Sequence, residues 1–596
     1  MQTEKTLTGY PSIDKPWKQH YRTSPIREFD ISQKFYTMLE SVNNDNLNGV
    51  AINFMGFKGN TWTYKELFQL VNQLADAYLK CGVKENDTVL LATVSGMDEA
   101  LNLLALNKIG AVSKWIDITA SAGELTSAIN EDNCRIVVAF PVIIPELEKC
   151  IQDTCVERVL YSSPEQFIRP GRVLSKSFSD FRKLVKTKQN STPLPPMPNG
   201  NKYMSFYDFL KIGSKNATVQ TAKYEKNKTV LKIQSSGTTG KPKSIVHTDY
   251  SINASIRKFT YTDIPLYPNK VMLKTAPSWV GYGLINTLAL GLAYSMTVLM
   301  TPMIGEDTLF VCNNQYDVAF GVPLHYRYLS SHISEISDMS RPQALISGGD
   351  KISAQEIEKF QSQFATKGCH APILNGAGNN EILGAGSVNF INANKPGTIG
   401  LPLYNDTTSI FDPYTGKEMH YDEVGEICYC SESTFVEYAN NPEKTAQVKQ
   451  THEDGTIWVH SNDLGSMDED GFITIVGRLS RIITVAAFKI SANQIEEVVL
   501  SHEAVKECVA VAVPDEENGE VPMIHIVLHD EYKAKQSKVE AEIRDLCSSQ
   551  LKTKASPKYY NFMDAIPYTS NNKQDFRQLE EIGVELIEKG IFKNKE

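Results

Sequence analysis

The chain has ten cysteines, but it lacks the spacings that would give them a metal-binding or redox function. None of them forms a Cys-x-x-Cys pair or stands with histidines at zinc-finger spacing, so zinc sites of that kind are not expected. In a chain of 596 residues, scattered cysteines are typical of reduced thiols and favour a cytoplasmic location. The first ten residues, MQTEKTLTGY, also lack the charged-then-apolar pattern of a signal peptide.

An excess of positive charge is absent as well. Lys and Arg total 60 against 70 Asp and Glu, which gives a net charge of −10. This balance offers no electrostatic footprint for DNA or RNA, and we expect no nucleic-acid partner. The hydrophobic share of 41% and the charged share of 22% are close to those of soluble globular proteins, which argues against disordered and fibrous classes.

Only one long stretch without charge, residues 275–305, raises the question of a membrane span. A spanning helix needs about 20 mostly apolar residues, but Asn286 and three glycines at 281, 283 and 291 interrupt this stretch. We therefore predict a buried helix that leads into a buried strand, and no membrane span.

Short apolar runs rich in β-branched residues alternate with helical patterns along the first 350 residues. The first set has runs at 88–95, 134–140 and 157–162 and helical patterns at 64–81 and 98–110; the second set has runs at 229–234, 271–275, 296–300, 317–323 and 344–347. Strand–helix alternation predicts mostly parallel sheets, so the expected class is α/β with two similar halves. The Pro-, Asn- and Lys-rich segment 164–227 is expected to be a surface excursion between them.

From about residue 395 the sequence pattern changes to short β-rich segments separated by tight turns. We predict a large N-terminal domain over residues 1–478, made of the two halves and a β-rich subdomain, and a small mobile α+β domain over residues 479–596. In the small domain we expect a helix from Ser491 through His502 with Ser491 as its N-cap. The domain is expected to begin with the segment 481–490, and the other expected elements are strands at 507–513 and 522–528 and a helix near 537–551.

The strongest local signal is a loop rich in glycine, hydroxyls and lysine that follows an apolar strand. Its residues are Ser235, Ser236, Gly237, Thr238, Thr239, Gly240, Lys241, Pro242 and Lys243. Glycines let backbone N–H groups turn inward, hydroxyls donate hydrogen bonds and lysines supply charge, so the loop is suited to phosphate oxygens. A kinase or GTPase loop would need Ser or Thr after Lys241, where this chain has Pro242.

This loop resembles the phosphate loop of the adenylate-forming superfamily, which includes acyl-CoA synthetases, adenylation domains of peptide synthetases and luciferase. Further segments resemble the motifs of that family in the same order along the chain. They are Ser347-Gly348-Gly349-Asp350, Asn375-Gly376-Ala377-Gly378-Asn379-Asn380-Glu381, residues 397–402, Gly425-Glu426-Ile427, residues 458–470, Gly477-Arg478 and residues 567–573.

The resemblance implies a role for one or more residues in each of several motifs. The family's phosphate loop, here 235–240 with Lys243, holds the phosphates, and the turn at Gly349 and Asp350, with Gly376, Ala377 and Gly378, lies against adenine. Glu381 would hold Mg²⁺ as a hard carboxylate, and Asn380 stands where the family contacts the α-phosphate. Asp463 would bind the ribose hydroxyls, Arg478 would precede the interdomain hinge, and Lys573 would hold the carboxylate and the α-phosphate.

The chemistry that the resemblance implies is that of an acid–thiol ligase. ATP would activate a small carboxylic acid to an acyl-AMP with release of pyrophosphate, and a thioester would follow, on coenzyme A in the first interpretation. Two anions must meet in the first step, so Mg²⁺ at Glu381 and the cation Lys573 are expected between them. Two alternatives stay open: an acceptor phosphopantetheine arm on a carrier protein, and a degenerate non-catalytic nucleotide-binding relative.

The sequence departs from the family pattern at several of these positions. Ala377 stands where the family has an aromatic residue that stacks on adenine. Asn380 stands where the family has the threonine that contacts the α-phosphate, and Asn572 where it has the glycine before the catalytic lysine. Ser480 replaces the usual Asp or Lys of the hinge, and the lysine–glycine run of the thiolation loop becomes residues 484–487, TVAA. Without the glycine of the thiolation loop, a close approach of pantetheine is less favoured, so the motifs support the adenylation step better than the thioester step.

Substrate information is limited to the region of residues 277–283. Trp279, Gly283 and Gly376 are the expected lining of the acyl pocket, and Trp279 suggests an apolar one. Val280 stands about where amino-acid-activating domains have an aspartate, so an α-amino acid is not the expected substrate. His247 is expected to be a structural histidine whose hydrogen bonds are satisfied.

Overall fold

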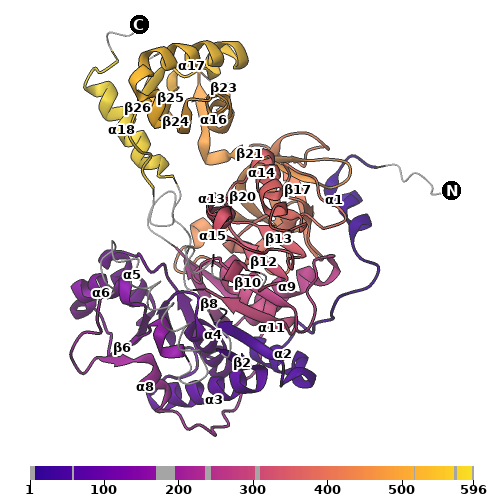
Figure 1. The fold of residues 1–596 in the computed structure, drawn as a ribbon, viewed down its shortest axis with the longest axis vertical. Coiled ribbons are helices and arrows are strands. Elements are labelled where there is room, and N and C mark those ends of the chain that lie inside the picture. The colour runs from indigo at the N-terminus through magenta and orange to yellow at the C-terminus, as the bar shows by residue number, and fades with distance from the viewer. Residues whose placement is uncertain are drawn as a thin grey trace, which may run out of the picture.

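The computed structural model describes residues 7–592 apart from residues 55, 57–59, 169–194, 235–242, 302–308, 310, 314, 487, 516 and 569–573. A seven-stranded and a nine-stranded sheet form the body, and two five-stranded sheets follow later in the chain. Figure 1 shows the C-terminal part, in yellow, standing apart from the body beyond β21 (Ile473–Arg478). This is the α/β architecture that the sequence predicts.

The seven-stranded sheet of the first half has the order β7-β6-β5-β3-β4-β8-β9. All neighbours are parallel except β8 and β9. The strands are β3 (Thr88–Ala92), β4 (Val112–Trp115), β5 (Ile136–Ala139), β6 (Arg158–Tyr161), β7 (Tyr203–Ser205), β8 (Thr229–Gln234) and β9 (Ser244–Thr248). The helices are α3 (Tyr64–Lys80), α4 (Met97–Ile109), α5 (Ala122–Asp132), α6 (Ile144–Cys150) and α8 (Phe206–Leu210).

The nine-stranded sheet of the second half has the order β16-β15-β14-β13-β12-β10-β11-β1-β2. Its strands are β1 (Val50–Phe54), β2 (Thr61–Thr63), β10 (Val271–Lys274), β11 (Thr297–Met300), β12 (Val318–Gly321), β13 (Ala344–Ser347), β14 (Ile373–Asn379), β15 (Gly384–Val388) and β16 (Leu401–Pro402). The helices of this half are α2 (Phe35–Val42), α9 (Asp249–Arg257), α13 (Pro323–Ser331) and α14 (Ala354–Ala365). The short helix α1 (Pro11–Asp14) lies near β17 (Thr407–Phe411) of a later sheet. The strands β1 and β2 thus belong to the second sheet although they come first in the chain. The order of strands along the sequence did not indicate this.

The uncharged stretch forms the buried helix and strand that the sequence predicts. It consists of α10 (Gly281–Gly283), a π-helical segment η8 (Leu284–Ala289) and α11 (Leu290–Ala293), and the buried strand β11 follows. Among the described residues, no helix combines the length and the apolar character that crossing a membrane requires.

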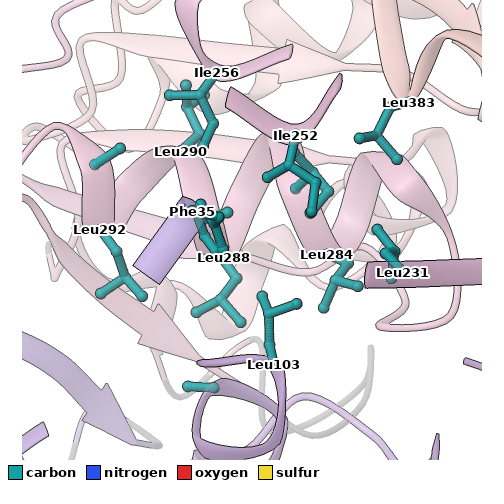
Figure 2. Close-up of a cluster of buried hydrophobic side chains, with 14 of the residues drawn as sticks. Phe35, Leu103, Leu231, Ile252, Ile256, Leu284, Leu288, Leu290, Leu292 and Leu383 are labelled. Atoms are coloured by element: carbon teal, nitrogen blue, oxygen red, sulfur yellow. The ribbon is translucent and has the colours of Figure 1, made fainter. Parts of the chain in front are cut away.

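One continuous apolar core joins the two halves. Leu103 on α4 of the first half lies close to Leu284 and Leu288 on the η8 segment of the second half (Figure 2), and all three side chains are buried. Every residue of α4 is buried, as expected for a helix that has protein on all sides. The core therefore fixes the relative position of the two sheets, whose carboxyl ends carry the candidate site.

The β-rich subdomain and the small domain follow. The first contains β17 (Thr407–Phe411), β18 (Gly425–Cys430), α15 (Pro442–Val448), β19 (Lys449–Thr451), β20 (Ile457–Met467) and β21. The second contains β22 (Ile482–Val485), β23 (Phe488–Ser491), α16 (Ala492–Leu500), β24 (Val505–Asp515), β25 (Gly519–Leu528), α17 (Gln536–Gln550), β26 (Tyr559–Phe562) and α18 (Phe576–Glu588). The change of sheet between Arg478 and Ile482 is consistent with a domain boundary near 478, which stays a prediction.

Two local expectations were wrong in detail. The segment 164–227 is not only a surface excursion, because β7 within it pairs in parallel with β6 and extends the first sheet. Ser491 does stand at the N-cap of α16, but its side chain makes no capping hydrogen bond, so tertiary packing and not the cap holds this helix start.

Candidate active site

The candidate site lies at the carboxyl ends of β13 and β14, where open parallel sheets bind ligands. The turn after β13 contains Gly348, Gly349 and Asp350; Gly349 has a φ of +88°, which glycine adopts without strain. Asp350 is exposed. A Cβ on Gly348 would lie 3.4 Å from Cζ of Tyr282 and 3.5 Å from the carbonyl oxygen of Gly376, so these three residues meet at one point.

The glycines of β14 permit a close approach of β15. A Cβ on Gly378 would lie 1.9 Å from the carbonyl oxygen of Gly384, and one on Gly376 would lie 2.8 Å from that of Ser387. Ala377, between them, is opposite Ser387 in the ladder. The requirement for glycine at 376 and 378 is therefore explained by strand pairing, and their proposed contact with a nucleotide stays a prediction.

The turn that follows β14 is built around Asn380. Its Oδ1 accepts a hydrogen bond from the backbone N–H of Gly281 at 3.0 Å, and its Nδ2 donates to the carbonyl oxygen of Gln234 at 3.4 Å. Asn380 thus links the start of α10 to the end of β8, directly before residues 235–242. An asparagine at this position can make both bonds because its side chain has a donor and an acceptor.

His247 supports the same turn from β9. Its Nε2 lies 2.8 Å from the carbonyl oxygen of Asn380, and its Nδ1 lies 3.3 Å from Oγ of Ser251. Burial lowers the pKa of His247 to about 3, so the imidazole is neutral and donates to Asn380. His247 has two hydrogen-bond partners, as the sequence predicts for a structural histidine.

Glu381 lies in this turn and is held by the β-rich subdomain. The phenol of Tyr438 donates a hydrogen bond to its Oε1 at 2.6 Å, and the N–H of Phe435 donates to its carbonyl oxygen at 2.7 Å. Burial raises the pKa of Glu381, and the hydrogen bond from Tyr438 opposes that rise. The contact with Tyr438 was not expected, because a tyrosine 57 residues further along the chain has no local signal that links it to Glu381.

Asp463 and Arg478 form a pair on neighbouring strands. They are opposite each other in the β20–β21 ladder, and Nε of Arg478 lies 2.8 Å from Oδ1 of Asp463. The charge of Arg478 lowers the pKa of Glu381 and that of Asp463 raises it, which places the three groups in one electrostatic neighbourhood. The structure thus pairs Asp463 with Arg478, and both charges act on Glu381, which belongs to a different part of the sequence.

A buried glutamate that sequence reasoning did not single out supports this pair. Glu426 is 5% exposed; its Oε1 accepts from the N–H of Asn462 at 2.8 Å, and its Oε2 lies 2.7 Å from Nδ1 of His460. Asn462 has a φ of +65° and directly precedes Asp463, and its Nδ2 donates to Oγ of Ser480 at 2.9 Å. Glu426 therefore fixes the irregular part of β20 that carries Asp463, and Asn462 ties that part of the strand to the predicted hinge.

Trp279 lies where the two halves face each other. It is half-buried and packs against Val94, Ile118 and Phe140, which follow the carboxyl ends of β3, β4 and β5. Its surroundings are apolar, as the sequence suggests. A Cβ on Gly283 would lie 1.9 Å from the carbonyl oxygen of Pro277, so close backbone packing requires the glycine, and its expected place in the acyl pocket stays a prediction.

Several predicted residues lie outside the described part of the chain. They are Ser235, Ser236, Gly237, Thr238, Thr239, Gly240, Asn572, Lys573 and Ala487. The residues that flank these two segments are described. Gln234 pairs with Ser244, and Lys243, directly before Ser244, is half-buried. Tyr568 forms a β-bridge with Gln574. Tyr568 also contributes to the electrostatic surroundings of Arg327 on α13, as Asp350 does.

Comparison with known proteins identifies the same two parts of the chain. Residues 39–439 match the profile of a family described as AMP-binding enzyme, and residues 494–573 match the profile of the AMP-binding enzyme C-terminal domain. A long-chain-fatty-acid–CoA ligase of Bacillus subtilis is 25% identical over 583 residues, covering 94% of this chain and 96% of the relative. A 4-coumarate–CoA ligase of Petroselinum crispum is 22% identical over 534 residues, covering 87% and 88%.

Solved structures agree on the fold. The crystal structure of an anthranilate CoA ligase in complex with anthranoyl-AMP superimposes with a TM-score of 0.75 at 18% identity, covering 93% of this chain and 98% of that one. At this identity the likeness establishes the fold, and it agrees with the two halves and the smaller C-terminal domain described above.

Proposed function

Because the chain belongs to the AMP-binding enzyme family, we propose that it is an ATP-dependent acid–thiol ligase that makes an acyl-AMP and then an acyl-CoA. The observation that carries the proposal is the ion pair of Asp463 with Arg478, whose two charges both act on Glu381 in the turn after β14. Relatives of nearly the same length are named as CoA ligases.

In this proposal each site residue has one task in the first step. The loop of residues 235–240, with Lys243, binds the phosphates of ATP, and Gly349, Asp350 and the 376–378 backbone lie against adenine. Asp463 accepts hydrogen bonds from the ribose hydroxyls, and its pairing with Arg478 orients the carboxylate. Lys573 draws the substrate carboxylate and the α-phosphate together, which offsets the repulsion of two anions.

Mg²⁺ is the metal that this donor set fits. Glu381 offers a hard carboxylate oxygen in the turn after β14, and Mg²⁺ is usually held by one or two carboxylates together with substrate phosphates. When bound, the ion would neutralise charge on the phosphate oxygens during displacement. Glu381 itself only has to remain ionised and correctly placed, which the Tyr438 hydrogen bond assists.

We place the acyl group near Trp279, at the junction of the two halves, and propose an apolar or aromatic monocarboxylic acid as substrate. The support is the apolar contact of Trp279 with Val94, Ile118 and Phe140. The named substrates of the relatives, a long-chain fatty acid and 4-coumarate, belong to the same chemical range.

Coenzyme A is the proposed acceptor, and a carrier protein is the alternative. The alternative is motivated by the loop after β22, where Ala486 has a φ of +45° at a position next to the family's glycine. An alanine in this region is strained relative to glycine, so the loop is less suited to a close approach of the pantetheine arm. A cytoplasmic location is proposed as well, and ten unpaired thiols support it.

The test is a panel of fatty and aromatic acids in a pyrophosphate-release assay, run with and without coenzyme A and followed by mass spectrometry of the products. We expect release that depends on the acid, and an acyl-CoA when coenzyme A is present. Acyl-AMP without acyl-CoA would favour the carrier-protein alternative. No acid-dependent release with any member of the panel would favour the non-catalytic relative.

A further inference from the structure

A segment of the β-rich subdomain, residues 434–439, reaches back to the hairpin that flanks the phosphate loop. The N–H of Val436 donates to the carbonyl oxygen of Val246 at 2.8 Å, and that of Ala439 donates to the carbonyl oxygen of Ser244 at 2.8 Å. The segment thus runs along β9 as an additional edge. It is held to the body by backbone hydrogen bonds, so the position of its side chains is well defined.

Tyr438 is the residue of this segment that enters the candidate site. Its side chain is 4% exposed, its ring packs edge-to-face on Phe435 with the centroids 5.0 Å apart, and its hydroxyl donates to Oε1 of Glu381. Phe435 also donates its N–H to the carbonyl oxygen of Glu381. Two neighbouring residues therefore hold both the backbone and the carboxylate of Glu381.

The hydrogen bond from Tyr438 leaves room on the carboxylate of Glu381 for a cation. A metal ligand must be deprotonated. An ionised carboxylate has about four lone-pair sites, and the phenol occupies one, so the others can still hold a cation.

We propose that Tyr438 is a positioning residue for the metal carboxylate: its hydroxyl holds Oε1 of Glu381 in place, while the N–H of Phe435 holds the backbone of the same residue. The inference rests on the proposed function, because it takes Glu381 as the ligand of the divalent ion. Tyr438 itself touches neither the metal nor the substrate in this arrangement.

The experiment uses the full chain, a non-hydrolysable ATP analogue and Mn²⁺ as the metal probe, with binding followed by electron paramagnetic resonance. The Tyr438→Phe variant removes only the hydroxyl. We expect its Mn²⁺ affinity in the presence of the nucleotide to be about tenfold weaker, the effect of losing one hydrogen bond to a charged group.

A matched control is Tyr421→Phe. The hydroxyl of Tyr421 also donates to a carboxylate, Oδ2 of Asp14 at 3.0 Å, but that pair lies outside the candidate site. This variant should bind Mn²⁺ as the wild type does. Equal losses in the two phenylalanine variants would overturn the inference.

The Glu381→Gln variant separates this inference from the function on which it rests. In its background, Tyr438→Phe should cause no further loss of Mn²⁺ affinity, whereas a general folding defect would cause one and would overturn the inference. If Glu381→Gln weakens Mn²⁺ binding but Tyr438→Phe does not, the inference is wrong and the proposed function stands. If Glu381→Gln binds Mn²⁺ normally, the metal role of Glu381 and the inference fail together.

Discussion

A buried ion pair between the two halves lends itself to a quantitative test. Nζ of Lys274, at the end of β10 in the second half, lies 3.2 Å from Oε1 of Glu99 on α4 of the first half, and both side chains are completely buried. Nζ also donates to Oγ of Ser95 at 2.5 Å and to the carbonyl oxygen of Ala276 at 2.9 Å. The pair lies beside the region of Trp279, so its loss bears on the site as well as on stability.

Removing one partner leaves the other charge buried without compensation. Glu99→Leu or Lys274→Met alone should therefore cost about 3–5 kcal/mol, whereas the double variant should recover most of that loss, because buried pairs are often replaceable by apolar residues. At about 2.1 cal/mol/K per residue, a body of residues 1–478 that unfolds as one unit has an unfolding entropy of about 1 kcal/mol/K. Each single variant should then melt about 3–5 °C lower than the wild type.

The assay is thermal unfolding of the wild type, both single variants and the double variant by calorimetry. Arg577→Ala provides a comparison, because Arg577 and Glu581 form an exposed pair and such pairs contribute little. The reasoning would be refuted by single variants that melt with the wild type, or by a double variant whose loss equals the sum of the single losses.

Three further predictions follow from other residues. Burial raises the pKa of Asp98 to about 7, against about 3.9 in the unfolded chain. Between these values the folded chain keeps a proton that the unfolded chain loses, so the free energy of unfolding should fall as the pH rises through this range. Asp98→Asn should flatten this pH dependence in urea titrations, and an unchanged pH dependence in the variant would contradict the prediction. Glu426→Gln should loosen β20 at Asn462 and raise the KM for ATP about tenfold, the effect of a weakened charged hydrogen bond. A normal KM in pyrophosphate exchange would contradict the supporting role of Glu426. Leu288→Ala, at the junction of the halves, should destabilise the body by about 2–5 kcal/mol in urea unfolding, and a loss below about 1 kcal/mol would mean that the junction is loosely packed.

The alternation of strands and helices and the order of the motifs could be predicted from the sequence because both are local signals. Buried strands such as β5 and β10 read as short β-branched runs, and the family motifs stand in continuous segments. The resemblance to the adenylate-forming superfamily is confirmed by the two matching family profiles.

The remaining features depend on contacts between distant segments, which no local pattern encodes. β1 pairs with β11 although some 240 residues separate them, and neither strand indicates its partner. Nothing in the sequence distinguishes Tyr438 from other aromatic residues, and only the fold brings its hydroxyl to the carboxylate of Glu381. Asn380 and Ser480 looked like departures from a motif, whereas the structure gives each a hydrogen bond to another element, Asn380 with Gly281 and Ser480 with Asn462.

The central claim, that this chain activates a carboxylic acid by adenylation, is tested most directly by ATP–pyrophosphate exchange in the wild type and in Lys573→Ala. With an accepted acid, the wild type should exchange and the variant should not, while ATP binding by the variant, followed by calorimetry, should persist. Undiminished exchange in Lys573→Ala would contradict the account.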